Sequence, residues 1–182
     1  RAAELLAAAK RPAIVAGSRV TRSGALQELV RFAECLGAQV FGESLSSTIA
    51  FPLDHPLYSG ELLRVAKPLR AMLEGFDLLF FIGMEAFILS FPPDVHILPE
   101  GARTMHLDLN PWEIGKNFPA DPALFGDPKA TLPLLTAALE QALGEAGRGR
   151  ALERRREAEK IAGEIQKKQT PPALTPDTES AK

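Results

Sequence analysis

The sequence predicts an α/β fold built on a parallel sheet. Residues 13–16 and 78–82 are short apolar runs without alternation, a pattern typical of strands buried on both faces. Residues 104–108 form a third segment of strand length. A helical pattern at residues 26–36 follows the first run, and another short strand is predicted at residues 39–41. This strand, helix and strand form a compact βαβ unit, so we expect the sheet to be parallel there.

The N-terminal segments fit this arrangement. Residues 1–10 are rich in alanine and leucine, which predicts a short helix before the first strand. The strand leads into residues 17–24, a small, polar and basic segment that we expect to be a loop. Ser23 or Thr21 is a candidate cap for the following helix, and Gly37 provides its C-terminal stop.

The middle of the chain alternates irregular and regular segments. Residues 42–49 predict an irregular turn or a short helix, and residues 51–60 predict an ordered loop because of their prolines and final glycine. A helix is predicted at residues 65–74. The clearest strand of the chain then ends at Gly83. The mostly apolar residues 84–90 that follow end before the two prolines at positions 92 and 93, which break any regular structure.

Residues 104–132 contain the most informative pattern in the sequence: two short strands followed by a helix start. A strand ends in carboxylate and amide side chains at Asp108 and Asn110, and a second short strand is predicted at residues 123–125. Asp127 is a candidate N-cap of the next helix, with Pro128 at its first position. Such a pair of strands is typical of the nucleotide-binding edge of a parallel α/β sheet.

The C-terminal part is helical and increasingly charged. Residues 128–143 predict an amphipathic helix, and Gly144 and Gly147 are expected to end it. Residues 151–168 predict a charged helix, and we predict no structure for the proline-, threonine- and serine-rich residues 169–182. We expect the chain to be a piece of a longer protein.

Composition excludes several classes of function. A chain of 182 residues with 46% hydrophobic residues suits one globular domain. The formal net charge of −2 provides no basic surface for nucleic acid, and no apolar run approaches the roughly 20 residues that span a membrane. With Cys35 as the single cysteine there is no internal disulfide, so a cytoplasmic location is expected.

Three loops are candidates for a ligand site, because ligands of open α/β sheets bind beyond the carboxyl ends of the strands. Glycine allows a phosphate to approach the backbone, arginine adds charge-assisted hydrogen bonds, and an aspartate or asparagine can hold ribose hydroxyls. The candidate cofactor-binding residues are Gly17, Ser18, Arg19, Gly83, Met84, Asp108 and Asn110.

The same residues also allow an interpretation without a ligand. Residues 17–24 match neither the dinucleotide fingerprint nor the P-loop pattern. Gly17 and Gly83 are therefore also candidates for residues that only form tight turns after their strands. No pair of histidines or His–Cys pair has metal-ligand spacing, and no catalytic triad order is present. We therefore expect no catalytic residue and no metal ligand in this chain.

Residues 106–117 read His-Leu-Asp-Leu-Asn-Pro-Trp-Glu-Ile-Gly-Lys-Asn, and residues 126–132 read Gly-Asp-Pro-Lys-Ala-Thr-Leu. Together with residues 11–17 and 51–58, they resemble the central domain of the thiamine-diphosphate-dependent enzymes. That family includes acetolactate synthase, pyruvate oxidase, benzoylformate decarboxylase and oxalyl-CoA decarboxylase. The segments occur in the family's order and cover most of the chain.

The resemblance implies a Rossmann-like three-layer α/β/α domain of the deoxyhypusine-synthase type, with a six-stranded parallel sheet. Residues 1–147 would form this domain, and residues 148–182 would be a charged helix and linker toward a C-terminal thiamine-diphosphate-binding domain. Thiamine diphosphate and magnesium would be held by flanking domains outside this chain. The parent enzyme would be a homodimer or homotetramer.

The family's central domain holds FAD in acetolactate synthase and pyruvate oxidase, holds ADP in oxalyl-CoA decarboxylase, and is empty in benzoylformate decarboxylase. The FAD binders typically carry a polar, arginine-containing loop after the position of Gly83. Here the loop is apolar and contains Glu85, which would repel a diphosphate. The sequence therefore favours a parent that decarboxylates or ligates 2-keto acids without flavin.

Three functions remain open. The first is a structural and subunit-interface domain that performs no catalysis alone. The second is a binding module for FAD or ADP. The third is an unrelated free-standing NAD enzyme.

Overall fold

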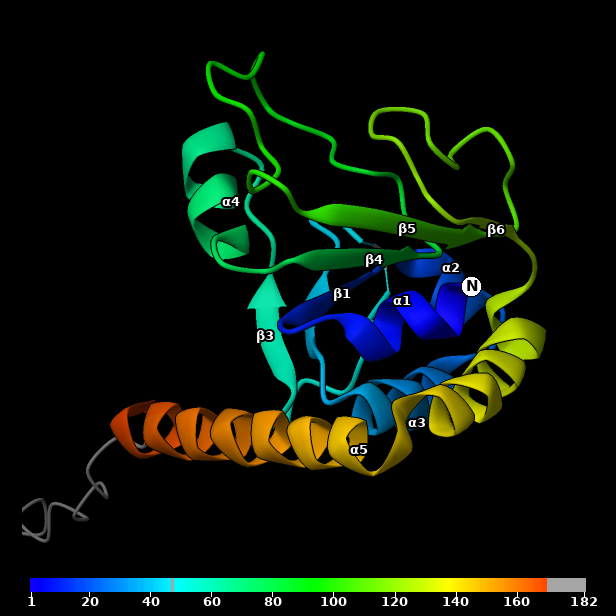
Figure 1. Cartoon of the computed structure of the whole chain (residues 1–182). Coiled ribbons are helices and arrows are strands. Elements are labelled where there is room, and N and C mark those ends of the chain that lie inside the picture. Colours follow the sequence, from blue (N-terminus) through cyan, green and yellow to red (C-terminus); the bar gives the residue numbers. More distant parts are fainter. Residues whose placement is uncertain (47, 170–182) are drawn as a thin grey trace, which may run out of the picture.

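Six strands form one parallel sheet in the computed structural model, which describes residues 1–46 and 48–169, with side chains described to residue 163 (Figure 1). The strand order β3-β2-β1-β4-β5-β6 is the Rossmann order, and every neighbouring pair is parallel. The predicted Rossmann-like α/β fold with a six-stranded parallel sheet is confirmed. The strands are β1 (Pro12–Ala16), β2 (Gln39–Gly42), β3 (Tyr58–Glu61), β4 (Leu78–Ile82), β5 (Arg103–Asp108) and β6 (Ala123–Phe125).

Helices cover both faces of the sheet unequally. Helices α1, α3 and α5 pack on one face, and α4 with the long loops after β4 and β5 covers the other (Figure 1). A short helix, α2, follows β1 directly. The bounds are α1 (Ala2–Ala8), α2 (Ser18–Arg22), α3 (Leu26–Leu36), α4 (Ala66–Leu73) and α5 (Pro128–Gln169).

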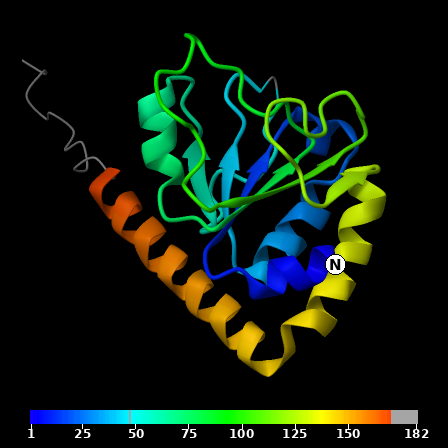
Figure 2. The ribbon, with the colours of Figure 1, turned by 45° about the horizontal axis from the view of Figure 1, so that its top comes forward.

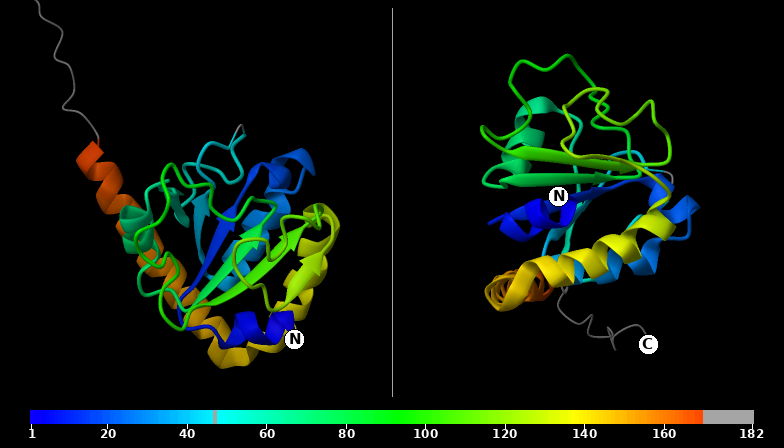
Figure 3. Two further views of the ribbon diagram at one scale, coloured as in Figure 1. Left: turned by 90° about the horizontal axis from the view of Figure 1, so that it is seen from above. Right: turned by 45° about the vertical axis from the view of Figure 1, so that its right-hand side comes forward.

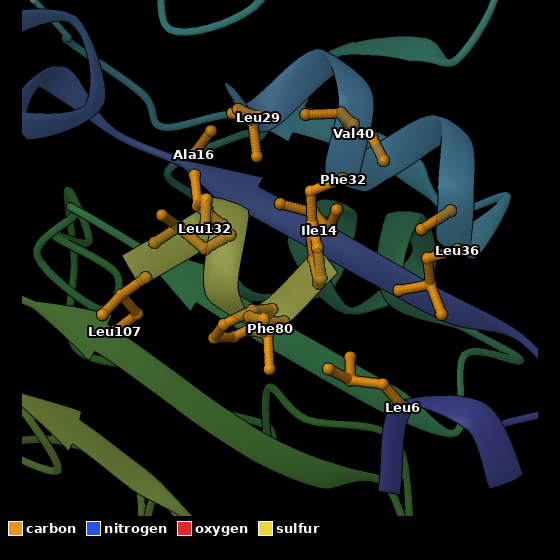
Figure 4. Close-up of a cluster of buried hydrophobic side chains, with 14 of the residues drawn as sticks. Leu6, Ile14, Ala16, Leu29, Phe32, Leu36, Val40, Phe80, Leu107 and Leu132 are labelled. Atoms are coloured by element: carbon orange, nitrogen blue, oxygen red, sulfur yellow. The ribbon is translucent and has the colours of Figure 1, made fainter. Parts of the chain in front are cut away.

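The larger core lies between the sheet and helices α1, α3 and α5. Phe32 of α3 and Phe80 of β4 meet edge to face with ring centroids 5.7 Å apart, and both are fully buried. Figure 4 shows side chains of the central strands, Ile14, Phe80 and Leu107, gathered with side chains of the three helices, Leu6, Leu29, Phe32, Leu36 and Leu132.

The opposite face is also buried, which explains why the strand sequences do not alternate. Val15 and Phe81 point into a second core with Leu69 and Leu73 of α4. All five residues of β1 and of β4 are buried. The unalternating apolar runs therefore correspond to the central strands of a sheet covered on both sides.

Several local predictions are confirmed. Gly37 ends α3 in the left-handed conformation with φ of 65°. The Asp127 carboxylate accepts a hydrogen bond of 2.7 Å from the Lys129 backbone N–H, so it caps α5 with Pro128 at the first position. Strand β6 lies beside β5 and leads into this cap.

Two segments predicted as loops contain regular structure. Residues 18–22 of the predicted basic loop form α2, which is held by tertiary contact: the Arg19 N–H donates to the Gly83 carbonyl at 3.0 Å. Residues 58–60 of the second predicted loop belong to the edge strand β3, which starts after the last proline of that loop.

The predicted caps at Ser23 and Thr21 are wrong. Their hydroxyls donate instead to the carbonyls of Val20 and Ile49, and α3 begins without a side-chain cap.

Helix α5 bends into two arms at Gly144, whose φ of 58° and ψ of −167° are not helical. We call residues 128–143 the first arm and residues 145–163 the second arm. Figures 2 and 3 show the second arm, in orange, turning away from the first. Among the described residues, no helix combines the length and apolarity needed to cross a bilayer. Of residues 169–182, for which the sequence predicts no structure, residue 169 is the last of α5, and residues 170–182 lie outside the described part of the chain.

Candidate functional site

The carboxyl ends of the central strands meet at the switch point between β1 and β4. From β1 the chain continues to β2 and β3 on one side, whereas β4 is followed by β5 and β6 on the other. In Rossmann-like sheets this point is where ligands bind. All seven candidate residues, Gly17, Ser18, Arg19, Gly83, Met84, Asp108 and Asn110, follow or end β1, β4 and β5, so the structure brings them to this one edge.

The turns after β1 and β4 are locked together by backbone hydrogen bonds. The Gly17 N–H donates to the Ile82 carbonyl at 3.0 Å, and the Gly83 N–H donates to the Leu107 carbonyl at 2.9 Å. A Cβ atom at Gly17 would lie 2.6 Å from the Gly83 carbonyl oxygen and 2.5 Å from Cβ of Met84, which is itself buried. Glycine is required at position 17 by the close packing of these two turns.

A carboxylate fills the space in front of Gly17. Glu43 follows β2, and its Oε1 accepts a hydrogen bond of 2.8 Å from the Glu85 backbone N–H. A Cβ atom at Gly17 would collide with the Glu43 carboxylate. Burial raises the pKa of Glu43 above its ordinary value, although the Glu85 N–H and the Arg19 charge partly oppose the shift.

Sequence reasoning missed Glu43. The available signal was its position directly after a parallel strand, the same signal that identified Asp108. Glu43 therefore places a carboxyl group of the protein itself against the Gly17 turn.

A buried ion pair occupies the other half of the edge. Arg19 Nε donates to both Asp108 oxygens, at 2.8 and 3.0 Å, and Asp108 is 0% exposed. Nη1 of Arg19 lies 3.9 Å from Glu85, and Nε2 of His106 lies 3.7 Å from Asp108. Burial alone would raise the pKa of Asp108, but the His106 imidazole and the Arg19 guanidinium outweigh it and hold that pKa below its ordinary value.

Asn110 completes the cluster through its backbone. Its N–H donates to Asp108 Oδ1 at 2.8 Å, and its side-chain oxygen accepts from the Trp112 N–H at 3.2 Å. The Asp108 oxygens are thus engaged within the chain by Arg19 and Asn110. A ribose hydroxyl would have to displace one of these partners.

The cavities beside Glu43 are too small for a nucleotide. One, next to Met84 and Phe87, has a volume of about 10 Å³, and another, next to Ala16 and Tyr58, has about 50 Å³. Small-molecule sites usually enclose about 300–1,000 Å³. Within the described residues, no group of three or more His, Cys, Asp or Glu side chains is arranged to hold a metal ion.

The raised pKa of Glu43 and the lowered pKa of Asp108 predict how the stability of the chain depends on pH. Because the pKa of Glu43 is raised in the folded chain, the folded chain takes up this proton at a higher pH than the unfolded chain does. The contribution of Glu43 to stability therefore grows as the pH falls through its folded-state pKa toward its unfolded-state pKa of about 4.3. Asp108 contributes above its unfolded value of about 3.9 and loses that contribution only at lower pH. We expect the native chain to gain stability relative to Glu43→Gln as the pH falls from about 7 to about 5.

Urea midpoints of the two proteins at both pH values measure this difference. Asp108 remains ionised in both proteins over this range, so it cancels in the comparison. A difference that stays constant, or that changes in favour of Glu43→Gln at the lower pH, would contradict the burial of the Glu43 carboxylate.

Comparison with known families identifies relatives over most of the chain. The family model described as thiamine pyrophosphate enzyme, central domain, matches residues 1–135. The probable acetolactate synthase large subunit of Methanocaldococcus jannaschii is 38% identical over 140 residues, which cover 76% of this chain and 23% of that protein. Glyoxylate carboligase of Escherichia coli is 34% identical over 150 residues, covering 81% of this chain and 25% of that protein.

Solved structures show the same domain. The thiamine diphosphate-dependent 4-hydroxybenzoylformate decarboxylase of Rhodococcus jostii superposes with a TM-score of 0.69 at 30% identity, over 74% of this chain and 25% of that one. Benzoylformate decarboxylase of Polynucleobacter necessarius gives 0.66 at 27% identity, over 78% of this chain and 26% of that one. The chain thus spans about a quarter of the length of the relatives it matches.

Proposed function

The chain belongs to the family of thiamine pyrophosphate enzyme central domains, and from this membership we propose that it is the structural and subunit-interface domain of a 2-keto acid decarboxylase or carboligase. The domain performs no catalysis alone. Membership removes the alternative of an unrelated NAD enzyme. The parent enzyme is a lyase or a transferase that depends on thiamine diphosphate.

One observation carries the proposal: the chain's own side chains fill the ligand-binding edge of the sheet. The Glu43 carboxylate lies against Gly17, and Arg19 engages both oxygens of Asp108. Phosphate groups bind where free N–H groups and positive charge converge. Here the Glu85 N–H donates to Glu43 and Arg19 Nε donates to Asp108, whereas Arg19 Nη2 has no partner among the described residues. The adjacent cavities are far smaller than a nucleotide.

The alternative is a nucleotide-binding module for FAD or ADP. The observation that favours it is the convergence of Gly17, Gly83, Asp108 and Asn110 on one edge. Binding would require the Arg19–Asp108 pair to open and Glu43 to move. The buried Met84 and the acidic Glu85 offer no cation to a diphosphate, which favours the structural function.

The rest of the parent enzyme supplies the chemistry under this proposal. Thiamine diphosphate and magnesium are held by flanking domains of the same chain. The parent assembles as a homodimer or homotetramer in the cytoplasm, without nucleic acid or membrane partners. Residues 148–182 lead toward the C-terminal cofactor-binding domain.

A ligand screen by thermal unfolding tests the proposal. We expect FAD, ADP, NAD and thiamine diphosphate each to leave the unfolding midpoint of the chain unchanged, because the domain offers none of them a preformed site. A ligand at about 100 times its dissociation constant would add roughly 2.7 kcal/mol. For a domain of this size that corresponds to a midpoint increase of roughly 5–10 °C.

The four ligands distinguish the alternatives. An increase with FAD or ADP would establish the nucleotide-binding module and overturn the filled-edge account. An increase with thiamine diphosphate alone would contradict the assignment of cofactor binding to the flanking domains. Adenosine is the matched control, since it keeps the base and ribose but lacks phosphate.

A further inference from the structure

Helices α1 and α3 both end at the edge of the sheet where the strands begin. The last carbonyl groups of a helix have no partner within the helix and carry a partial negative charge. Ala7 lies in the last turn of α1, and Lys10 follows two residues after its end. Leu36 is the last residue of α3, and Gly37 is its C-cap. Their carbonyls form a surface that suits a cationic hydrogen-bond donor.

The second arm of α5 presents such donors. Arg154 donates to three carbonyls at once: Nη2 to Leu36 at 2.5 Å, Nε to Gly37 at 3.2 Å and Nη1 to Lys10 at 3.3 Å. Arg150 reaches the Ala7 carbonyl at 3.2 Å. The Arg154 guanidinium therefore joins the ends of both helices to the second arm.

Apolar contact adds little to this docking. Ala151 and Ala158 are buried, at 4% and 5% exposure, whereas Leu152 and Ile161 remain 47% and 43% exposed. The approach of the backbones is close, since a Cβ atom at Gly37 would lie 2.9 Å from Cα of Ala151. The arm thus docks through small residues and arginines rather than through a large hydrophobic face.

The arm is also separated from the sheet. The family match ends at residue 135, before the bend at Gly144, and no atom lies within 4 Å of a Cβ built on that glycine. A cavity of about 520 Å³ lies between the second arm and the start of the sheet, lined by residues such as Gln39, Phe76 and Glu157. Arg150 and Arg154 reach across to the carbonyls at the ends of α1 and α3.

We propose that the second arm, residues 145–163, is a strap that docks on the ends of α1 and α3 and releases as a unit about Gly144 while the sheet stays folded. Arg154 is the positioning residue that holds it docked. Docking sets the direction in which the chain leaves the domain. This device is independent of whether the edge at Gly17 binds a nucleotide.

Hydrogen exchange of the 182-residue chain tests the strap. In the native chain, amides of residues 150–160 should exchange at least about tenfold faster than the buried amides of β1 and β4, because local release requires less free energy than global unfolding. Arg154→Met should accelerate exchange in residues 150–160 by about tenfold and leave β1 and β4 within about twofold. Arg155→Met is the matched control; it removes only the 3.3 Å contact with Glu34 and should change exchange by less than about twofold.

A second variant tests whether the arm is also released by a change away from Arg154. Ala158→Lys places a long charged side chain in the buried contact and should accelerate the same residues. The proposal is overturned if the arm and the strands exchange at equal rates in the native chain. It is also overturned if Arg154→Met accelerates all elements together or changes none.

Discussion

Replacing Arg19 with methionine is expected to lower the free energy of unfolding by about 3–5 kcal/mol, the usual cost of leaving a buried charge without its partner. Asp108 is fully buried, and Arg19 Nε donates to both of its carboxylate oxygens, at 2.8 and 3.0 Å. Methionine keeps the apolar stem but removes the guanidinium. The pKa of Asp108 would then rise, because burial would no longer be outweighed by the cation.

Urea denaturation measures this loss of stability. Two further variants test whether the loss comes from the Arg19–Asp108 pair. Arg22→Met removes an exposed arginine from the same helix, α2, and should have a much smaller effect. The double variant Arg19→Met with Asp108→Leu removes both charges and should recover much of the stability. A loss no larger than that of Arg22→Met would contradict the account of a buried pair that fills the edge.

Replacing Gly17 with alanine is expected to cost about 2–3 kcal/mol through overpacking. The new Cβ would lie 2.5 Å from Met84 Cβ and 2.6 Å from the Gly83 carbonyl oxygen, and it would press on the Glu43 carboxylate. The backbone contributes no strain here, since φ of Gly17 is −113°. The loss of stability in Gly17→Ala therefore measures how tightly the turns after β1 and β4 pack against each other.

The matched control is Gly149→Ala, the same chemical change at a helical position where a Cβ meets nothing within 4 Å. It should stabilise helix α5 slightly, by up to about 1 kcal/mol, because alanine has the higher helix propensity. Thermal unfolding of both variants provides the comparison. A Gly17→Ala protein of native stability would mean that the turn is open, as a nucleotide-binding module requires.

The sheet was predictable because its physical signals are local. Unalternating apolar runs such as residues 78–82 reflect burial on both faces, and Asp127 with Pro128 marks a helix start regardless of the tertiary fold. Part of the family resemblance, residues 106–117, covers the end of β5 and the loop after it, which lie at the carboxyl edge of the sheet.

The state of the candidate site was not predictable in the same way. Whether Asp108 faces a ligand or an arginine depends on α2, which forms only because its backbone is held by the turn after β4. The position of Glu43 depends likewise on β2 lying beside β1. The sequence could therefore place seven residues at one edge, but the side chains that fill the space between them come from tertiary packing.

The carboxyl edge of the sheet is filled by Glu43, Arg19 and Asp108 of the chain itself. Calorimetric titration of ADP into the 182-residue chain at neutral pH is the decisive experiment, because ADP carries the ribose and diphosphate for which Asp108 and Gly17 were candidates. We expect no binding tighter than about 1 mM, corresponding to roughly −4 kcal/mol, because no preformed site is open to ADP. Saturable binding at one site with a dissociation constant of about 10 μM or less would contradict this expectation and would establish a nucleotide-binding module instead.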